Sequence, residues 1–218
     1  SLVTIANVAA RMNGNVTGAQ SLAVAAEMDY GTVLAVTVAA GGGVVGVNVS
    51  AGAVYFQGKA AASIGGSANI SGVPAITVST NGETRAISAA ATIGGGAVAV
   101  GAGLALAINR TEVRTSIGDG VTITGADAVN VTTDFASDAD AIILGVTGGG
   151  VAVGVSVAVA INNSKFYTYV GADPSNLGSE AETKGHVHAK NLVIRSAVSG
   201  DTLVTGVSVA AGGVAVNG

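Results

Sequence analysis

The 218-residue sequence contains no cysteine and no tryptophan, and it has only two prolines. Without cysteine there can be no disulfide bridge, thiol catalysis or cysteine-ligated zinc. Charged residues make up 10 % of the chain, against a usual ~25 %, and the hydrophobic share is 49 %. A disordered, solvated chain needs the opposite composition. The net charge of −4 offers no basic face, so we expect no nucleic-acid partner.

Glycine is the abundant residue, with 34 copies, and it recurs in clusters. The clusters lie at residues 41–43, 94–96, 148–150 and 212–213. The first two intervals are close to 53 residues, and the third is longer by about ten, which predicts an insertion near residues 171–185. Repetition at roughly 50 residues is typical of solenoids, propellers and arrays.

We therefore predict one repetitive domain without an internal linker, built from stacked units of about 53 residues. The predicted units are a partial unit at 1–29, units at 30–83, 84–138 and 139–200, and a partial unit at 201–218. The insertion near 171–185 belongs to the third full unit. Because both outer boundaries cut through a unit, we expect the chain to be a piece of a longer protein and to associate end to end.

Branched and small side chains alternate strictly in the best-matched segments. From Val151 to Ile161, valine or isoleucine occupies every odd position, and alanine, glycine or serine every even one. A period of two predicts β-strands, whose branched side chains we expect to fill a core while the small ones leave a flat outer face. Parallel stacking would give each valine a neighbour above and below, so the predicted fold class is all-β, a parallel β-helix (β-solenoid).

Two features of these segments leave alternatives open. Residues 30–58, 86–109 and 141–164 carry no charge and are long enough for membrane-spanning helices, although glycine and β-branched residues disfavour a helix. Twelve extended residues would span about 40 Å, which is long for a strand. Either the glycines interrupt the strands or the cross-section of the solenoid is wide and flat.

The phrase at residues 118–133, GDGVTITGADAVNVTT, resembles the repeats of large secreted bacterial haemagglutinins and filamentous adhesins. The neighbouring block at 94–109 and the lack of cysteine are closer to the fusobacterial leukotoxin family of filamentous adhesins. The resemblance implies a right-handed β-helix in a giant protein, secreted or held at the bacterial cell surface. It further implies a two-partner outer-membrane exporter, a host-cell receptor or matrix component as partner, and a role in leukocyte killing.

The candidate binding residues gather around the predicted insertion. They are Asp173, Asn176, Glu180, Glu182, His186 and His188. In an extended stretch the two histidines would project from one face, and His-x-His with a carboxylate can bind zinc or act as a pH switch. A solvent-facing surface is the simpler interpretation, and we expect no metal and no cofactor.

A second acidic group, Asp134, Asp138 and Asp140, lacks the glycine and terminal glutamate of an EF-hand. We interpret it as a charged turn at the edge of the molecule. No glycine cluster is followed by the lysine of a phosphate-binding loop, and no nucleophile elbow is present. The predicted function is thus a non-catalytic shaft and host-cell interaction surface. The alternative is a cytotoxin module that acts on host-cell membranes.

Overall fold

The structure, a computed structural model, describes residues 1–174 and 185–218, and its regular elements are all β-strands. In chain order they are β1 (Leu2–Met12), β2 (Val16–Thr17), β3 (Ser21–Ile64), β4 (Asn69–Ser71), β5 (Ala75–Ile117), β6 (Thr122–Asn162), β7 (Lys165–Val170) and β8 (His186–Asn217). They form one parallel sheet in which β3, β5, β6 and β8 are successive neighbours. The described residues include no helix that is long and apolar enough to cross a membrane.

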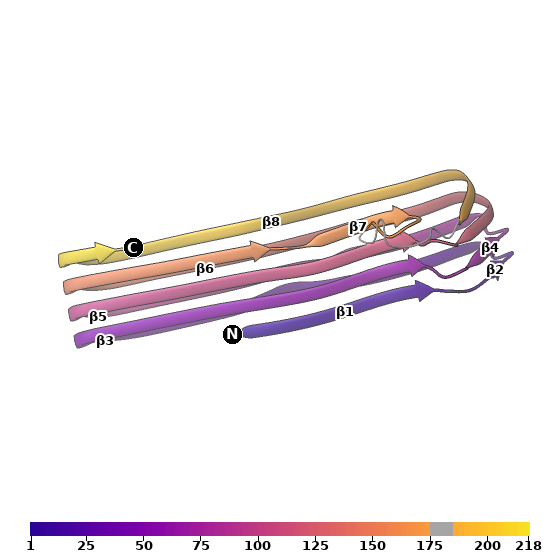
Figure 1. The fold of residues 1–218 in the computed structure, drawn as a ribbon. Helices are drawn as coiled ribbons and strands as arrows, with labels where there is room; N and C mark the ends of the chain where they lie inside the picture. The colour runs from indigo at the N-terminus through magenta and orange to yellow at the C-terminus, as the bar shows by residue number, and fades with distance from the viewer. Residues whose placement is uncertain (175–184) are drawn as a thin grey trace.

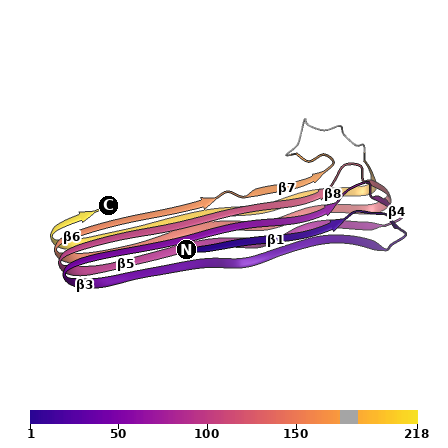
Figure 2. The same ribbon diagram turned by 60° about the horizontal axis from the view of Figure 1, so that its bottom comes forward.

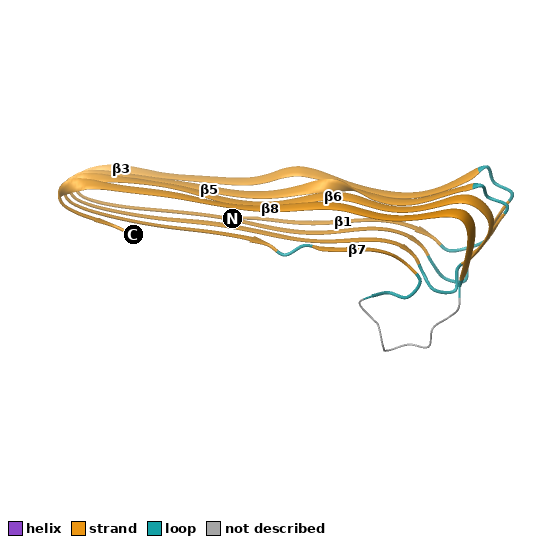
Figure 3. Cartoon of the chain, turned by 90° about the horizontal axis from the view of Figure 1, so that it is seen from above, coloured by secondary structure: helices purple, strands orange, loops and turns teal. Residues whose placement is uncertain are grey.

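Each long strand doubles back on itself at its glycine cluster (Figures 1 and 2). We call the part before the cluster the first limb and the part after it the second limb. Figure 3 shows the limbs as two layers, joined by a tight bend at one end, the glycine end, and by loops at the other, the loop end. The strand ladder continues through the bend, since Gly41, Gly42 and Gly43 pair with Gly94, Gly95 and Gly96.

The pairing register matches the spacing found in the sequence. Val45 pairs with Val98, which pairs with Val151, so these partners are 53 positions apart. On β8 the offset is larger, because Thr122 pairs with His186. The parallel sheet of long strands is consistent with the predicted β-solenoid. Gly101, Gly103 and Gly154 lie inside strands rather than between them, so the layers are long and flat.

The interior between the two layers becomes thinner toward the glycine end. Near the loop end it is filled by large side chains such as Ile64, Ile70 and Ile117. Met28 and the rings of Phe56 and Phe135 occupy the middle. Beyond them the buried cluster consists of Ala90, Ala105, Ala107, Ala141 and Ile143.

The prediction that branched side chains fill the core is wrong in this thin half. Ala99, Ala105 and Ala152 are fully buried, whereas Val151 and Val157 are 40 % and 48 % exposed. The small residues therefore face inward and the branched residues face solvent. Near the loop end, isoleucine and valine form the interior as expected.

The close approach of the layers explains this inversion. A Cβ atom at Gly101 would lie 2.4 Å from a Thr147 side-chain carbon, and one at Gly103 would lie 2.7 Å from Ile143. Such distances are far inside van der Waals contact, so the thin half has no room for larger inward side chains. Polar ones are admitted where they pair across the gap, as Ser50 and Thr92 do at 2.6 Å between their hydroxyl oxygens.

The glycines of the bend give the first prediction. Gly96 has a φ of 155°, and a Cβ there would lie 2.3 Å from the carbonyl oxygen of Gly43. We expect Gly96→Ala to destabilise the fold by about 1–3 kcal/mol, because it combines strain with a clash against backbone. Thermal or urea unfolding followed by circular dichroism measures the loss.

Gly95→Ala is the matched control for that substitution. A Cβ at Gly95 would meet nothing nearer than the Gly148 carbonyl oxygen at 4.0 Å, and this glycine does not have a positive φ. We expect its unfolding midpoint to stay close to that of the unsubstituted chain. Equal losses in the two variants would show that the bend is not as tight as described.

Candidate functional site

The structure describes three of the six predicted binding residues. Asn176, Glu180 and Glu182 lie outside the described residues. His186 and His188 are exposed at the start of β8, on either side of the partly buried Val187, so both histidines face solvent. Within residues 1–174 and 185–218, no group of three or more histidines, aspartates or glutamates is placed to hold a metal ion.

Asp173 is held in an ion-pair cluster beside β7. Arg114 pairs with Asp173, donates from Nε to Glu112 at 2.6 Å, and stacks 4.7 Å from the centre of the Tyr167 ring. Burial lowers the pKa of Arg114, but the hydrogen bond to Glu112 and the charge of Asp173 outweigh it and leave that pKa above its usual value. The ion pair of Asp173 with Arg114 thus holds the chain where it leaves β7. His186 and His188 lie on another strand, β8, and are not part of this cluster.

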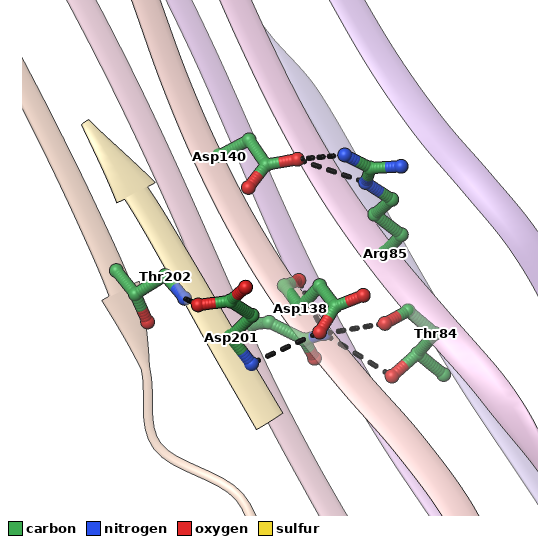
Figure 4. A network of polar contacts seen from close by, with 7 residues as sticks. Thr84, Arg85, Asp138, Asp140, Asp201 and Thr202 are labelled. Carbon is green, nitrogen blue, oxygen red and sulfur yellow. Dashed lines mark hydrogen bonds and ion pairs between the residues drawn. The ribbon is translucent and has the colours of Figure 1, made fainter. Parts of the chain in front are cut away.

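A second polar network crosses the molecule, and Figure 4 shows its contacts from close by. Its residues Thr84 and Arg85 lie about halfway along the first limb of β5. We call this network the polar band, and it comprises Thr84, Arg85, Asn109, Asp138, Asp140, Asp201 and Thr202. The buried Asn109 belongs to a second limb, and its amide donates to the backbone oxygens of Thr84 and Asp138 in first limbs, at 3.1 and 2.9 Å. These bonds tie the two layers together where the interior begins to thin.

The charged part of the polar band is an arginine–carboxylate pair between adjacent strands. Arg85 Nε and Nη2 donate to the same oxygen of Asp140 at 2.8 and 2.5 Å, and the Asp140 side chain is only 5 % exposed. The hydrogen bond and charge of Asp140, with smaller effects from Asp138 and Asp201, raise the pKa of Arg85 above its usual value. Asp134, Asp138 and Asp140 all lie within β6, so their interpretation as a charged turn at the edge is wrong.

A shallow hollow on the first-limb side is lined by carboxylates. Glu27 and Asp29 of β3, Glu83 of β5 and Asp134 of β6 surround Phe135, and the hollow has a volume of about 570 Å³. Acidic side chains on neighbouring strands repel one another, and salt screens that repulsion. This acidic surface has no local signal in the sequence, because its carboxylates come from three strands that meet only through pairing.

An apolar surface lies between the polar band and the glycine end. The outward side chains of the second limbs of β3, β5 and β6 are almost all aliphatic there; they are Val45, Val47, Val49, Ala51, Ala53, Val98, Val100, Ala102, Leu104, Leu106, Ile108, Val151, Val153, Val155, Val157, Val159 and Ile161. The first limbs present a second apolar face, with Leu34, Val36, Ile142, Leu144 and Val207 exposed. Soluble monomers rarely expose contiguous apolar patches of more than a few hundred Å², so two such faces indicate contact with another apolar phase.

No family model, curated protein or solved structure matches the chain.

The sequence does contain a signal for the two apolar faces. Over three successive repeats the branched positions of the second limbs are never polar, whereas the small positions include Asn48, Ser50, Asn109, Ser156 and Asn162. Asparagine and serine on the small-residue face indicate that this face packs against the opposite layer, where their side chains find hydrogen-bond partners. The branched face must then be the outer one. The polar band had no local signal, because Arg85 and Asp140 are 55 residues apart and meet only through strand pairing.

The Arg85–Asp140 pair yields the second prediction. Arg85→Leu leaves a nearly buried carboxylate without its cation and close to two further aspartates, and we expect it to cost about 1–3 kcal/mol of stability. Adding Asp140→Asn should restore much of the loss, because the unpaired charge is removed. Denaturant unfolding of the single and double variants measures the coupling.

Lys190→Met is the control for this experiment. It breaks an ion pair with Asp127 whose side chains are 78 % and 59 % exposed, and exposed pairs contribute little. A loss in Lys190→Met as large as that in Arg85→Leu would contradict a special role of the pair in the polar band.

Proposed function

We propose that this chain is a rigid, non-catalytic segment of a bacterial filamentous adhesin, which acts as a shaft and as a host-cell interaction surface. The observation that carries the proposal is the parallel register, in which β3, β5, β6 and β8 lie one above the next along most of their length. A stack of this kind extends by repetition and gains stability with each added neighbour.

The finer features of the shaft are part of the same proposal. Each coil comprises a first limb, a bend, a second limb and a loop, with 53 residues in the regular case and a right-handed path. The 53-residue offset between paired valines supports the coil length. The right hand, secretion or display at the cell surface, and export through an outer-membrane partner rest on the resemblance of residues 118–133 and 94–109 to filamentous adhesins.

The host-cell contact is proposed for a receptor or matrix component at the loop end. There, Asp173, His186 and His188 lie beside the segment 175–184, which falls outside the described residues. Loops that leave a repeat stack on one side are where repeat proteins carry binding residues. The proposed site requires neither a cofactor nor a metal.

The alternative function, a cytotoxin module acting on host membranes, is favoured by one observation, the two exposed apolar faces. Release of an encapsulated dye from phosphatidylcholine vesicles separates the two functions. We expect the shaft to leave the dye inside at micromolar protein. Release that scales with protein concentration would overturn the shaft in favour of the toxin.

End-to-end association of the chain is a direct consequence of the proposed stacking. β1 on one side of the stack and β8 on the other present backbone N–H and C=O groups that pair with no further strand in the described residues, and free strand edges are templates for pairing. We expect oligomers that grow with concentration in sedimentation-velocity experiments. A constant monomer up to millimolar protein would count against association and against the shaft.

A further inference from the structure

We propose that the half of the molecule between the polar band and the glycine end inserts into the hydrocarbon of a lipid bilayer, so that the shaft lies on the membrane with this half as a keel. The keel comprises residues 86–109 of β5, residues 141–162 of β6 and the segments of β3 and β8 that pair with them. This inference goes beyond the proposed shaft, which needs no lipid, and it requires no release of vesicle contents.

The first argument is the polarity of the keel, which is the reverse of that of a water-soluble fold. Its outer positions are valine, leucine, isoleucine and alanine on both sides, with Tyr55 and Thr205 as exceptions. Its interior is mainly alanine and glycine, with Ile143 and with serine, threonine and asparagine side chains, most of them hydrogen-bonded; among the described residues the hydroxyls of Ser88 and Ser156 have no hydrogen-bond partner. No charged residue lies within 86–109 or 141–164. A hydrocarbon solvent favours this arrangement, in which small and polar side chains lie inside and aliphatic side chains lie outside.

The second argument is length. From Ala86 to Gly96 the first limb of β5 spans about 33 Å, and the second limb from Ala97 to Asn109 spans about 40 Å, at ~3.3 Å per residue. The hydrocarbon layer of a bilayer is about 30 Å thick. Charges resume immediately past these limits, at Arg85 on one face and Arg110 on the other, so the polar band would lie at the headgroups.

The third argument concerns the backbone. In hydrocarbon each unpaired N–H or C=O group costs several kcal/mol, and a turn is usually where such groups occur. Here the parallel pairing runs from Gly94 through Gly96 and resumes at Val98, which is paired on both sides, so that Ala97 is the one residue of this bend outside the register. The bend of an inner coil therefore enters lipid with most of its peptide groups paired, and the longer free edges belong to the outermost coils, where stacked copies would cover them.

The fourth argument explains why insertion leaves the membrane sealed. The interior of the keel has no space for an added Cβ at Gly101, Gly103 or Gly145, where the nearest atoms would be 2.4 to 2.7 Å away. A wedge packed this tightly contains no path for water or ions. The keel is therefore a membrane anchor and not a channel.

A second copy of the chain fits these observations less well than lipid. Pairing through the second-limb face would cover one apolar face and leave the first-limb face, with Leu144 and Val207, in water. Lipid covers both faces and the glycine end at once. The net charge of −4 gives no attraction to anionic headgroups, so the probe is vesicles of zwitterionic phosphatidylcholine.

The proposal is tested by measuring how deeply a fluorophore on the protein enters the bilayer. Because the chain has no native cysteine, a single introduced cysteine carries the only label. An environment-sensitive fluorophore is attached at Val157→Cys, an exposed outer position in the middle of the keel, and separately at Thr132→Cys, an outer position between the polar band and the loop end. With vesicles we expect a blue shift and quenching by lipids brominated in the acyl chains at position 157, and neither at position 132.

Charge substitution provides the second readout. Leu144→Lys with Val157→Lys places one lysine on each apolar face, where water tolerates it because both side chains are exposed. We expect an unchanged circular dichroism spectrum in buffer and at least a tenfold loss of co-flotation with vesicles, since lysine at mid-bilayer depth is costly. The control, Thr77→Lys with Thr132→Lys, adds the same charge outside the keel and should change flotation less than twofold.

The outcomes that overturn the proposal are distinct from those that overturn the shaft. A label at position 157 that stays unquenched with vesicles excludes insertion. A blue shift at 157 without vesicles, together with self-association in sedimentation that the paired lysines reduce to end-to-end oligomers alone, assigns the faces to a second copy instead. Either result leaves the end-to-end stacking of the shaft standing. Dye release would overturn the sealed anchor, because it would show that the inserted half opens a path through the membrane.

Discussion

The close approach of the two layers near the glycine end is the constraint on which the rest of the structure depends. Where the walls are this near, an inward Cβ on Gly101 or Gly103 has no space, so the inward residues are mainly glycine, alanine and small polar residues, with Ile143 opposite Gly103. In a strand, successive side chains point to opposite faces, and the alternate valine, leucine and isoleucine residues must then face outward. The apolar surface is thus a geometric consequence of the thin interior.

The polar band marks the change between two kinds of interior. On the loop-end side, isoleucine, phenylalanine and methionine fill a thick core and the outer positions include Thr77, Ser79 and Thr132, as in an ordinary soluble strand fold. On the other side the polarity is reversed. Asn109 joins the layers at the boundary, and Arg85 with Asp140 joins adjacent coils there. Along each limb, the outer surface is therefore polar on the loop-end side of the polar band and apolar on the glycine-end side.

These two surfaces support different roles in the proposed shaft. The thick half contains the loops, the exposed histidines and Asp173, which belong to the aqueous side. The thin half contains aliphatic faces that water covers poorly. A shaft lying along a membrane would use both halves at once, with host-cell contacts on the loops and anchoring through the keel. Because every coil repeats the pattern, weak anchoring per coil would add along the stack.

The strands, their parallel stacking and the 53-residue spacing of partners such as Val98 and Val151 could be predicted from the residue pattern, because periods of two and of about 53 are visible in the chain alone. Which face of a strand is the inside could not be predicted in this way, because it depends on how the two layers pack. Alternation shows that a strand has two faces but not which of them is buried. Which face is buried depends on the distance to the opposite layer, and that distance is set by bends and side chains dozens of residues away. For the same reason the pairing of Arg85 with Asp140 follows from strand register and not from any local motif.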